Sequence, residues 1–242
     1  MHLTVVNLST SISPEEFQAT IRVLAQQVSV DFQPEWGVGA TLLGITSKLD
    51  KHRLAPIQGN RDAMIYLGDS SSDPTTGVDG ALGYHSINHK HVPYGFVYLD
   101  ICKEYGEVWT CTLSHEVLEL LGDPTAVMTV TGPAPKGGSR FVHYDLEVCD
   151  PTQGDSYAIN GVVVSNFVGR SYFELPGGSG KTNFLDLELK PFGVRPKGYF
   201  QYEDRAGTHQ VDGERVTPDM KKAKEKMKDA RRNARRAARS AE

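Results

Sequence analysis

The residues best suited to chemistry stand in the segment TCTLSHEVLELLGDP, residues 110–124, which contains His115, Glu116 and Glu119. The segment is typical of a single helix. Because a helix turns about 100° per residue, His115 and Glu119 project from one face, with Glu116 beside them. In the H-E-x-x-H motif this spacing binds a metal through the first and fifth positions, while the glutamate acts as a base. Here the fifth position is Glu119, so a carboxylate replaces the second imidazole.

A metal held by His115 and Glu119 needs at least one further protein ligand and an open position for water. Three acidic residues are candidates: Asp123, Glu147 and Asp150. Glu147 and Asp150 are three positions apart, so in an extended strand they would face opposite sides. A turn at 149–151 could bring them together.

Catalysis at such a site would use Glu116 to accept a proton from water and pass it to a leaving amine. The metal would stabilise the oxyanion, with help from a substrate-binding side chain: His85, Tyr144 or Tyr157. His85 precedes two further histidines, His89 and His91. These two lie in a polar stretch and are interpreted as exposed turn residues, whereas the predicted strand of His85 leads towards the helix.

The ligand set leaves the identity of the metal open. One histidine with two or three carboxylates would nearly neutralise a zinc ion and make it a weaker Lewis acid. Hard oxygen ligands also suit manganese or calcium, so a structural calcium-type site is an alternative. A further alternative needs no metal. The three ionisable residues would then be a polar helix face, with the leucines and valine between them packing as core.

Several elements that would position these residues are predicted from pattern. Residues 3–8, 28–32, 40–45, 63–69, 81–87 and 95–101 favour strands. A helix is expected from Ser13, a suitable N-cap, through about Gln27. The pair Asn160–Gly161 between two β-rich runs predicts a hairpin with a type I′ turn.

The composition indicates a globular chain of 242 residues with 39% hydrophobic and 23% charged residues. No apolar run approaches the roughly 20 residues that a membrane-spanning helix needs, and we expect no membrane association. The N-terminus has no basic region or cleavage site typical of a secretory signal. Three cysteines without close pairing favour reduced thiols. We therefore expect a cytoplasmic protein or a virion component.

The charge is distributed unevenly along the chain. Residues 217–242 carry ten Lys/Arg and four Asp/Glu, which gives +6 within a net charge of −4, so residues 1–216 carry −10. The basic segment is predicted to be an alanine-rich helix with a weak heptad stripe. We expect one domain over 1–216 and a helical tail over 217–242. The tail could serve a homo-oligomer, an anionic partner or non-specific binding to nucleic acid.

Four segments together resemble an uncharacterised bacterial and phage-associated family described as zincin-like metallopeptidases. They are SHEVLELLGDP, YDLEVCDPTQGDSYAINGVVVSNFV, DFQPEWGVGATL and GALGYHSINHKHVPYGFVYLD. The similarity covers about residues 20–200 and does not include the basic tail. Members carry a SHExxE…DP segment followed by an E-V-C-D or E-I-G-D segment. The family's motif positions correspond here to His115, Glu116, Glu119, Asp123, Glu147 and Asp150.

The resemblance implies an α+β fold of the zincin type, in which a backing helix and an active-site helix pack against a twisted mixed sheet. The strand at 81–87 or 95–101 would line the cleft and could hold a peptide by strand addition. The implied function is metal-dependent hydrolysis of a peptide or protein substrate. The alternative is a non-catalytic structural or interaction protein, such as a virion component, that keeps the fold with a structural metal or none.

Overall fold

The computed structural model describes residues 1–46, 62–72, 81–88, 90–135, 137, 140–174 and 180–217. The predicted tail helix lies outside these residues apart from Thr217, and so does His89. Among the described helices, none is long and apolar enough to cross a membrane.

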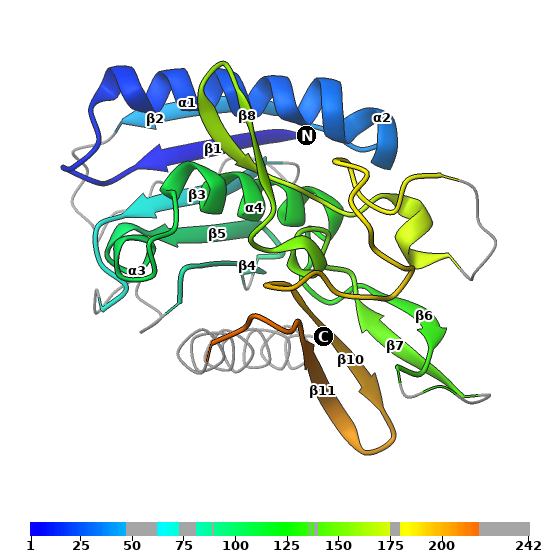
Figure 1. Ribbon diagram of the computed structural model, residues 1–242. Helices are drawn as coiled ribbons and strands as arrows, with labels where there is room; N and C mark the ends of the chain where they lie inside the picture. The colour runs from blue at the N-terminus through cyan, green and yellow to red at the C-terminus, as the bar shows by residue number, and fades with distance from the viewer. Residues whose placement is uncertain are drawn as a thin grey trace.

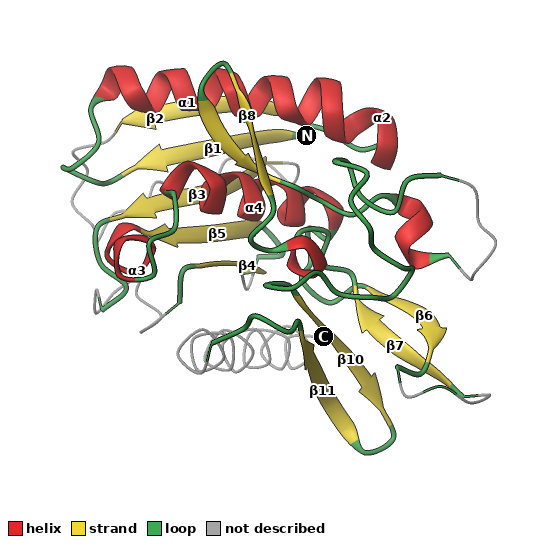
Figure 2. Ribbon diagram, viewed as in Figure 1, coloured by secondary structure: helices red, strands yellow, loops and turns green. Residues whose placement is uncertain are grey.

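The fold is α+β and contains a mixed five-stranded sheet in the order β2-β1-β3-β5-β4 (Figures 1 and 2). Its strands are β1 (His2–Asn7), β2 (Thr41–Thr46), β3 (Asp62–Gly68), β4 (Gly83–Ile87) and β5 (Pro93–Tyr98). The first three and β5 run parallel, whereas β4 pairs antiparallel with β5 at the end of the sheet.

Two longer helices cover one face of this sheet (Figure 2). Helix α1 (Pro14–Gln26) begins where Ser13 Oγ accepts a hydrogen bond from the Glu16 N–H at 3.1 Å, which confirms the predicted N-cap. Helix α4 (Trp109–Gly122) contains the HExxE residues. Buried side chains from both helices and the sheet form one core: among them are Leu3, Phe17, Ile65, Val97 and Val117.

A four-stranded antiparallel sheet and a hairpin complete the described fold. The second sheet has the order β11-β10-β7-β6, from β6 (Thr129–Pro133), β7 (Phe141–Asp145), β10 (Tyr199–Asp204) and β11 (Gly207–Asp212). The hairpin joins β8 (Ser156–Ile159) to β9 (Val162–Ser165). Asn160 and Gly161 have φ of 50° and 82°, so the predicted turn with two left-handed residues is confirmed.

The prediction of a strand at 28–32 is wrong. The chain continues from α1 as a π-helix (Gln27–Phe32), followed by the short α2 (Gln33–Trp36). In a strand Val28, Val30 and Phe32 would share one face. Instead Val28 and Phe32 are buried and Val30 is 61% exposed, which is the four-residue spacing of a helix.

The predicted strand at 95–101 also ends early. Strand β5 stops at Tyr98, and the short helix α3 (Leu99–Glu104) follows. Two short 3₁₀ helices, η2 (Asp150–Thr152) and η3 (Arg170–Phe173), follow later in the chain. The first of these helices lies next to the candidate site.

A buried hydrogen-bond network fixes α4 to the elements around it. Ser114 Oγ donates to Gln27 Oε1 at 2.7 Å and accepts from the Ser165 N–H at 3.0 Å. Gln27 Nε2 donates in turn to the Ser165 carbonyl at 2.9 Å. The π-helix, α4 and β9 are therefore joined immediately beside His115.

We expect Ser114→Ala to destabilise the fold by about 1–3 kcal/mol, because it leaves the buried Ser165 N–H and Gln27 carbonyl oxygen without this partner. Chemical denaturation would measure the loss in the free energy of unfolding. The matched control is Ser29→Ala, since Ser29 is exposed and its hydroxyl donates to the Ala25 carbonyl four residues earlier. A loss in the control equal to that in Ser114→Ala would contradict the assignment.

Candidate metal centre

Helix α4 buries its ionisable residues as completely as its apolar ones. His115 is 7% exposed, Glu116 1% and Glu119 0%. Leu113, Val117 and Leu120 pack the remaining sides of the same helix into the core. The helix therefore does not have a solvated polar face opposite a leucine face, which was the alternative without a metal. Carboxylates are rarely buried unless they are paired or bind a metal, so Glu116 and Glu119 are expected to have a compensating partner.

His115 lies between two carboxylates. Its Nε2 is 3.0 Å from Glu119 Oε1, one helical turn away, and 3.2 Å from Asp150 Oδ1. Burial lowers the pKa of His115, but the charge of Glu119 and the hydrogen bonds to Asp150 and Glu119 outweigh this effect and hold the pKa well above its usual value. Metals bind the neutral imidazole, so a cation at this position would displace that proton.

Glu147 and Asp150 reach the cluster because the chain turns directly after β7. Both are buried, and Asp150 begins the 3₁₀ turn η2. A turn at 149–151 was the predicted way to bring Glu147 and Asp150 together, and η2 is that turn. Glu147 then faces His85, and Asp150 faces His115. The Thr152 hydroxyl donates to the Cys149 carbonyl at 3.1 Å, which closes the turn.

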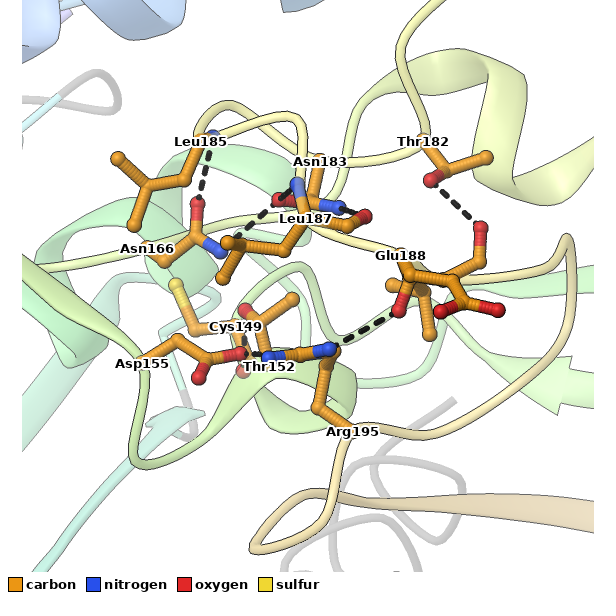
Figure 3. Close-up of polar contacts among 11 residues, drawn as sticks. Cys149, Thr152, Asp155, Asn166, Thr182, Asn183, Leu185, Leu187, Glu188 and Arg195 are labelled. Atoms are coloured by element: carbon orange, nitrogen blue, oxygen red, sulfur yellow. Dashed lines mark hydrogen bonds and ion pairs between the residues drawn. The ribbon is translucent and has the colours of Figure 1, made fainter.

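Polar contacts connect the residues that follow η2 to a later part of the chain (Figure 3). Arg195 donates from Nε to Asp155 at 2.8 Å and from an Nη to the Glu188 carbonyl at 3.0 Å. Next to it, Asn166 Nδ2 donates to Asn183 Oδ1 at 3.2 Å. These polar contacts connect the segment after η2 to the chain between 182 and 195, and so limit the movement of Asp150.

His85 enters the cluster from the terminal strand β4. It is 0% exposed, and its Nδ1 lies 3.7 Å from Glu116 Oε2 and 3.8 Å from Glu119 Oε2. Its Nε2 lies 4.0 Å from Glu147 Oε2. Neither ring nitrogen has a hydrogen-bond partner within the described part of the chain. We predicted a substrate-binding role for His85; the structure places it with Glu119 and Glu147 in a group of donor atoms that could hold a metal ion.

Gly83, two residues before His85 on the same face of β4, makes room for Glu116. A Cβ atom at this position would lie 2.7 Å from Glu116 Oε1 and 2.9 Å from the Phe96 carbonyl. The backbone contact cannot give way without moving β5, so the carboxylate of Glu116 would have to shift. Position 83 therefore sets where this carboxylate lies.

For the metal-dependent hydrolysis expected from the sequence, Gly83→Ala should lower the rate by roughly a hundredfold, the cost of displacing a reacting group by about 1 Å. The fold and the metal content should be unchanged, because His115 and Glu119 are not displaced. Steady-state kinetics and metal analysis would measure both. The matched control is Gly68→Ala at the end of β3, where no atom lies within 4 Å of the added Cβ. Equal activity in the two variants would contradict this role for Gly83.

Three residues predicted for the site have other partners in the structure. Asp123 accepts hydrogen bonds from the N–H groups of Thr125 and Met128 at 3.0 and 2.7 Å, so its carboxylate closes the end of α4. The Tyr144 hydroxyl donates to the Pro133 carbonyl at 2.6 Å. The structure does not bring either residue into the cluster.

Tyr157 is also held elsewhere. Its hydroxyl donates to Asp31 Oδ2 at 2.7 Å and accepts from Gln27 Nε2 at 3.1 Å. Both partners belong to the π-helix. The proximity of Tyr157 in sequence to Asp150 was therefore misleading, because the hairpin directs the ring towards the π-helix.

A pocket opens onto the side of the cluster that contains His115 and Glu116. Its lining also includes Leu82, Glu107, Cys111, Thr112, Gln153, Gly154 and Ser165. Burial raises the pKa of Cys111 to about 11, so this thiol is protonated at neutral pH. Cys102, Cys111 and Cys149 are all free thiols. The pocket thus offers access to the Glu116 carboxylate and the His115 imidazole rather than to a nucleophilic thiolate.

The spacing of the donor atoms is one that could hold a divalent cation. Two groups have ligand atoms within 4.8 Å of one another: His115 with Glu116 and Glu119, and His85 with Glu119 and Glu147. Ligands about 2.1 Å from one ion are separated by roughly 3.0–3.4 Å at right or tetrahedral angles. The distances from His115 Nε2 to Glu119 and Asp150, 3.0 and 3.2 Å, correspond to that spacing.

In comparisons with protein-family models, curated proteins and solved structures, no match to the chain was found.

Proposed function

We propose that the protein is a metal-dependent hydrolase of peptide bonds, with Glu116 as the general base. The observation that supports this most directly is the convergence of His115, Glu116 and Glu119 at a pocket, with Asp150 Oδ1 3.2 Å from His115 Nε2. In this proposal His115, Glu119 and Asp150 would hold the cation. A bound divalent cation supplies Lewis acidity, which polarises a carbonyl and lowers the pKa of water. Zinc is the proposed metal, with manganese or calcium as alternatives.

Glu116 would take a proton from the attacking water and return it to the leaving amine. Its Oε2 has no hydrogen-bond partner among the described residues, and the pocket reaches its side chain. Gly83 and the helix restrict its position, so the carboxylate is oriented before substrate binds. Preorganisation of this kind lowers the reorganisation that a reaction requires.

The arrangement of the elements supports the proposed zincin-like architecture. Helix α4 lies beside the sheet and α1 packs on the same face. The strand at the end of the sheet, β4, runs antiparallel to β5 and borders Glu116 through Gly83. A peptide lying along β4 would place its backbone next to the base, and main-chain hydrogen bonds would hold it there.

Removal and return of the metal tests this function. We expect the full chain to cleave members of a mixed peptide library, chelator to abolish cleavage, and zinc or manganese to restore it. Mass spectrometry of the products would identify the bonds that are broken. If metal-loaded protein leaves every peptide intact, the hydrolase proposal is contradicted and a structural or interaction role is favoured.

A further inference from the structure

We infer that the cluster binds a second divalent cation, held by His85 and Glu147 and bridged to the first by Glu119. The inference deepens the proposed function and rests on its metal centre at His115. It assigns a ligand role to the two residues of the cluster, His85 and Glu147, that a single cation at His115 does not use.

The orientation of the Glu119 carboxylate is the first observation. Its Oε1 lies 3.0 Å from His115 Nε2, and its Oε2 lies 3.8 Å from His85 Nδ1. The two oxygens of one carboxylate thus point to two different imidazoles. A carboxylate placed in this way can give one oxygen to each of two ions, as in hydrolytic sites where two cations lie roughly 3.5–4 Å apart.

His85 is the second observation. The ring is fully buried, and within the described chain neither of its nitrogens forms a hydrogen bond. A buried histidine normally forms a hydrogen bond through at least one ring nitrogen. A buried polar group without a partner loses its hydrogen bonds to water and gains none in exchange. Carboxylate oxygens of Glu116 and Glu119 lie 3.7 and 3.8 Å from its Nδ1, and one of Glu147 lies 4.0 Å from its Nε2. These distances are longer than hydrogen bonds, and donor atoms of His85, Glu119 and Glu147 all lie within 4.8 Å of one another, a group that could hold an ion.

The number of donor groups is the third observation. Four carboxylates and two imidazoles meet in the cluster: Glu116, Glu119, Glu147, Asp150, His85 and His115. A catalytic zinc ion usually has three protein ligands and an open position. The cluster supplies two sets of three ligands that share Glu119, so two ions match this set of side chains better than one.

Each ion would have one imidazole and oxygen ligands, with Glu119 shared. His115 and Asp150 would complete the first site, and His85 and Glu147 the second. Glu116 belongs to the group of His115, places its Oε2 3.7 Å from His85 Nδ1 and borders the pocket. Oxygen-rich ligation with a single imidazole suits manganese and zinc.

Metal counting with manganese tests the inference without measuring activity. The full chain is freed of metal, dialysed against manganese and analysed for bound ion, and its low-temperature electron paramagnetic resonance spectrum is recorded. We expect two ions per chain and the spectrum of an exchange-coupled pair. His85→Ala and the conservative Glu147→Gln should each retain one ion with an uncoupled spectrum. His143→Ala, on the exposed face of β7, should bind two ions as the unmodified chain does.

One ion per chain, whether or not His85→Ala changes it, would overturn the second site. In that case a single ion lost on His115→Ala would leave the proposed hydrolase centre intact. Two ions in a protein that cleaves no peptide would support the second site and contradict the proposed function. Circular dichroism of each metal-free variant shows whether it is folded, and Glu147→Gln decides the result if His85→Ala is not.

Discussion

Glu116→Gln is expected to lower the rate of peptide hydrolysis by about a hundred- to ten-thousandfold, the usual contribution of a positioned general base. The amide keeps the size of the side chain and its place beside Gly83, but it cannot accept the proton of the attacking water. Because the proposed ligands of the cation are His115, Glu119 and Asp150, metal content should be nearly unchanged. The comparison of kcat with bound metal in the same preparation is therefore the informative measurement.

The control for this variant is Glu104→Gln, at the exposed end of α3. It removes one carboxylate from the protein without touching the cluster, so activity and metal content should both stay at the level of the unmodified chain. If Glu116→Gln retains full activity, Glu116 is not the base. If it loses metal together with activity, Glu116 is a ligand rather than a base.

His115→Ala should remove most of the stabilisation that metal gives to the fold. A ligand present at a thousand times its Kd stabilises the native state by about 4.1 kcal/mol. Loss of a direct ligand should weaken binding by at least about a hundredfold, which reduces this gain to about 1.4 kcal/mol at the same metal concentration. Thermal unfolding with and without zinc would show a large increase in Tm for the unmodified chain and a small one for the variant.

His143→Ala serves as the matched control for that experiment. His143 is exposed on β7, and its Nδ1 lies 3.2 Å from the Thr131 hydroxyl, away from the cluster. The increase in Tm caused by zinc should be the same as in the unmodified chain. An undiminished increase in His115→Ala would mean that the stabilising ion binds elsewhere.

Local patterns in the sequence were sufficient for elements whose signals lie within a few residues. Ser13 and Pro14 specify the start of α1 through a side-chain cap and a fixed φ, and Asn160–Gly161 specifies a hairpin turn through two left-handed residues. The spacing of His115 and Glu119 was equally informative, since a helix fixes which residues share a face. The α+β class is confirmed, whereas the basic tail helix remains a prediction.

Non-local pairing was beyond the reach of such patterns. His85 joins the cluster because β4 is placed against α4, thirty residues later in the chain, and only the tertiary fold sets that contact. Asp123 was misplaced for the opposite reason. It follows Glu119 by one helical turn, but the helix ends there and its carboxylate accepts from the N–H groups of the next turn. His85 was predicted as a substrate-binding residue because its strand leads towards the helix, but its place among the carboxylates could not be read from the sequence.

Anomalous diffraction at the zinc edge, from crystals of the full chain grown with zinc, tests the metal centre most directly. The account predicts a peak about 2.0–2.2 Å from His115 Nε2 and from a carboxylate oxygen of Glu119. A map with no peak beside these two side chains, in crystals that hold zinc elsewhere, would contradict it.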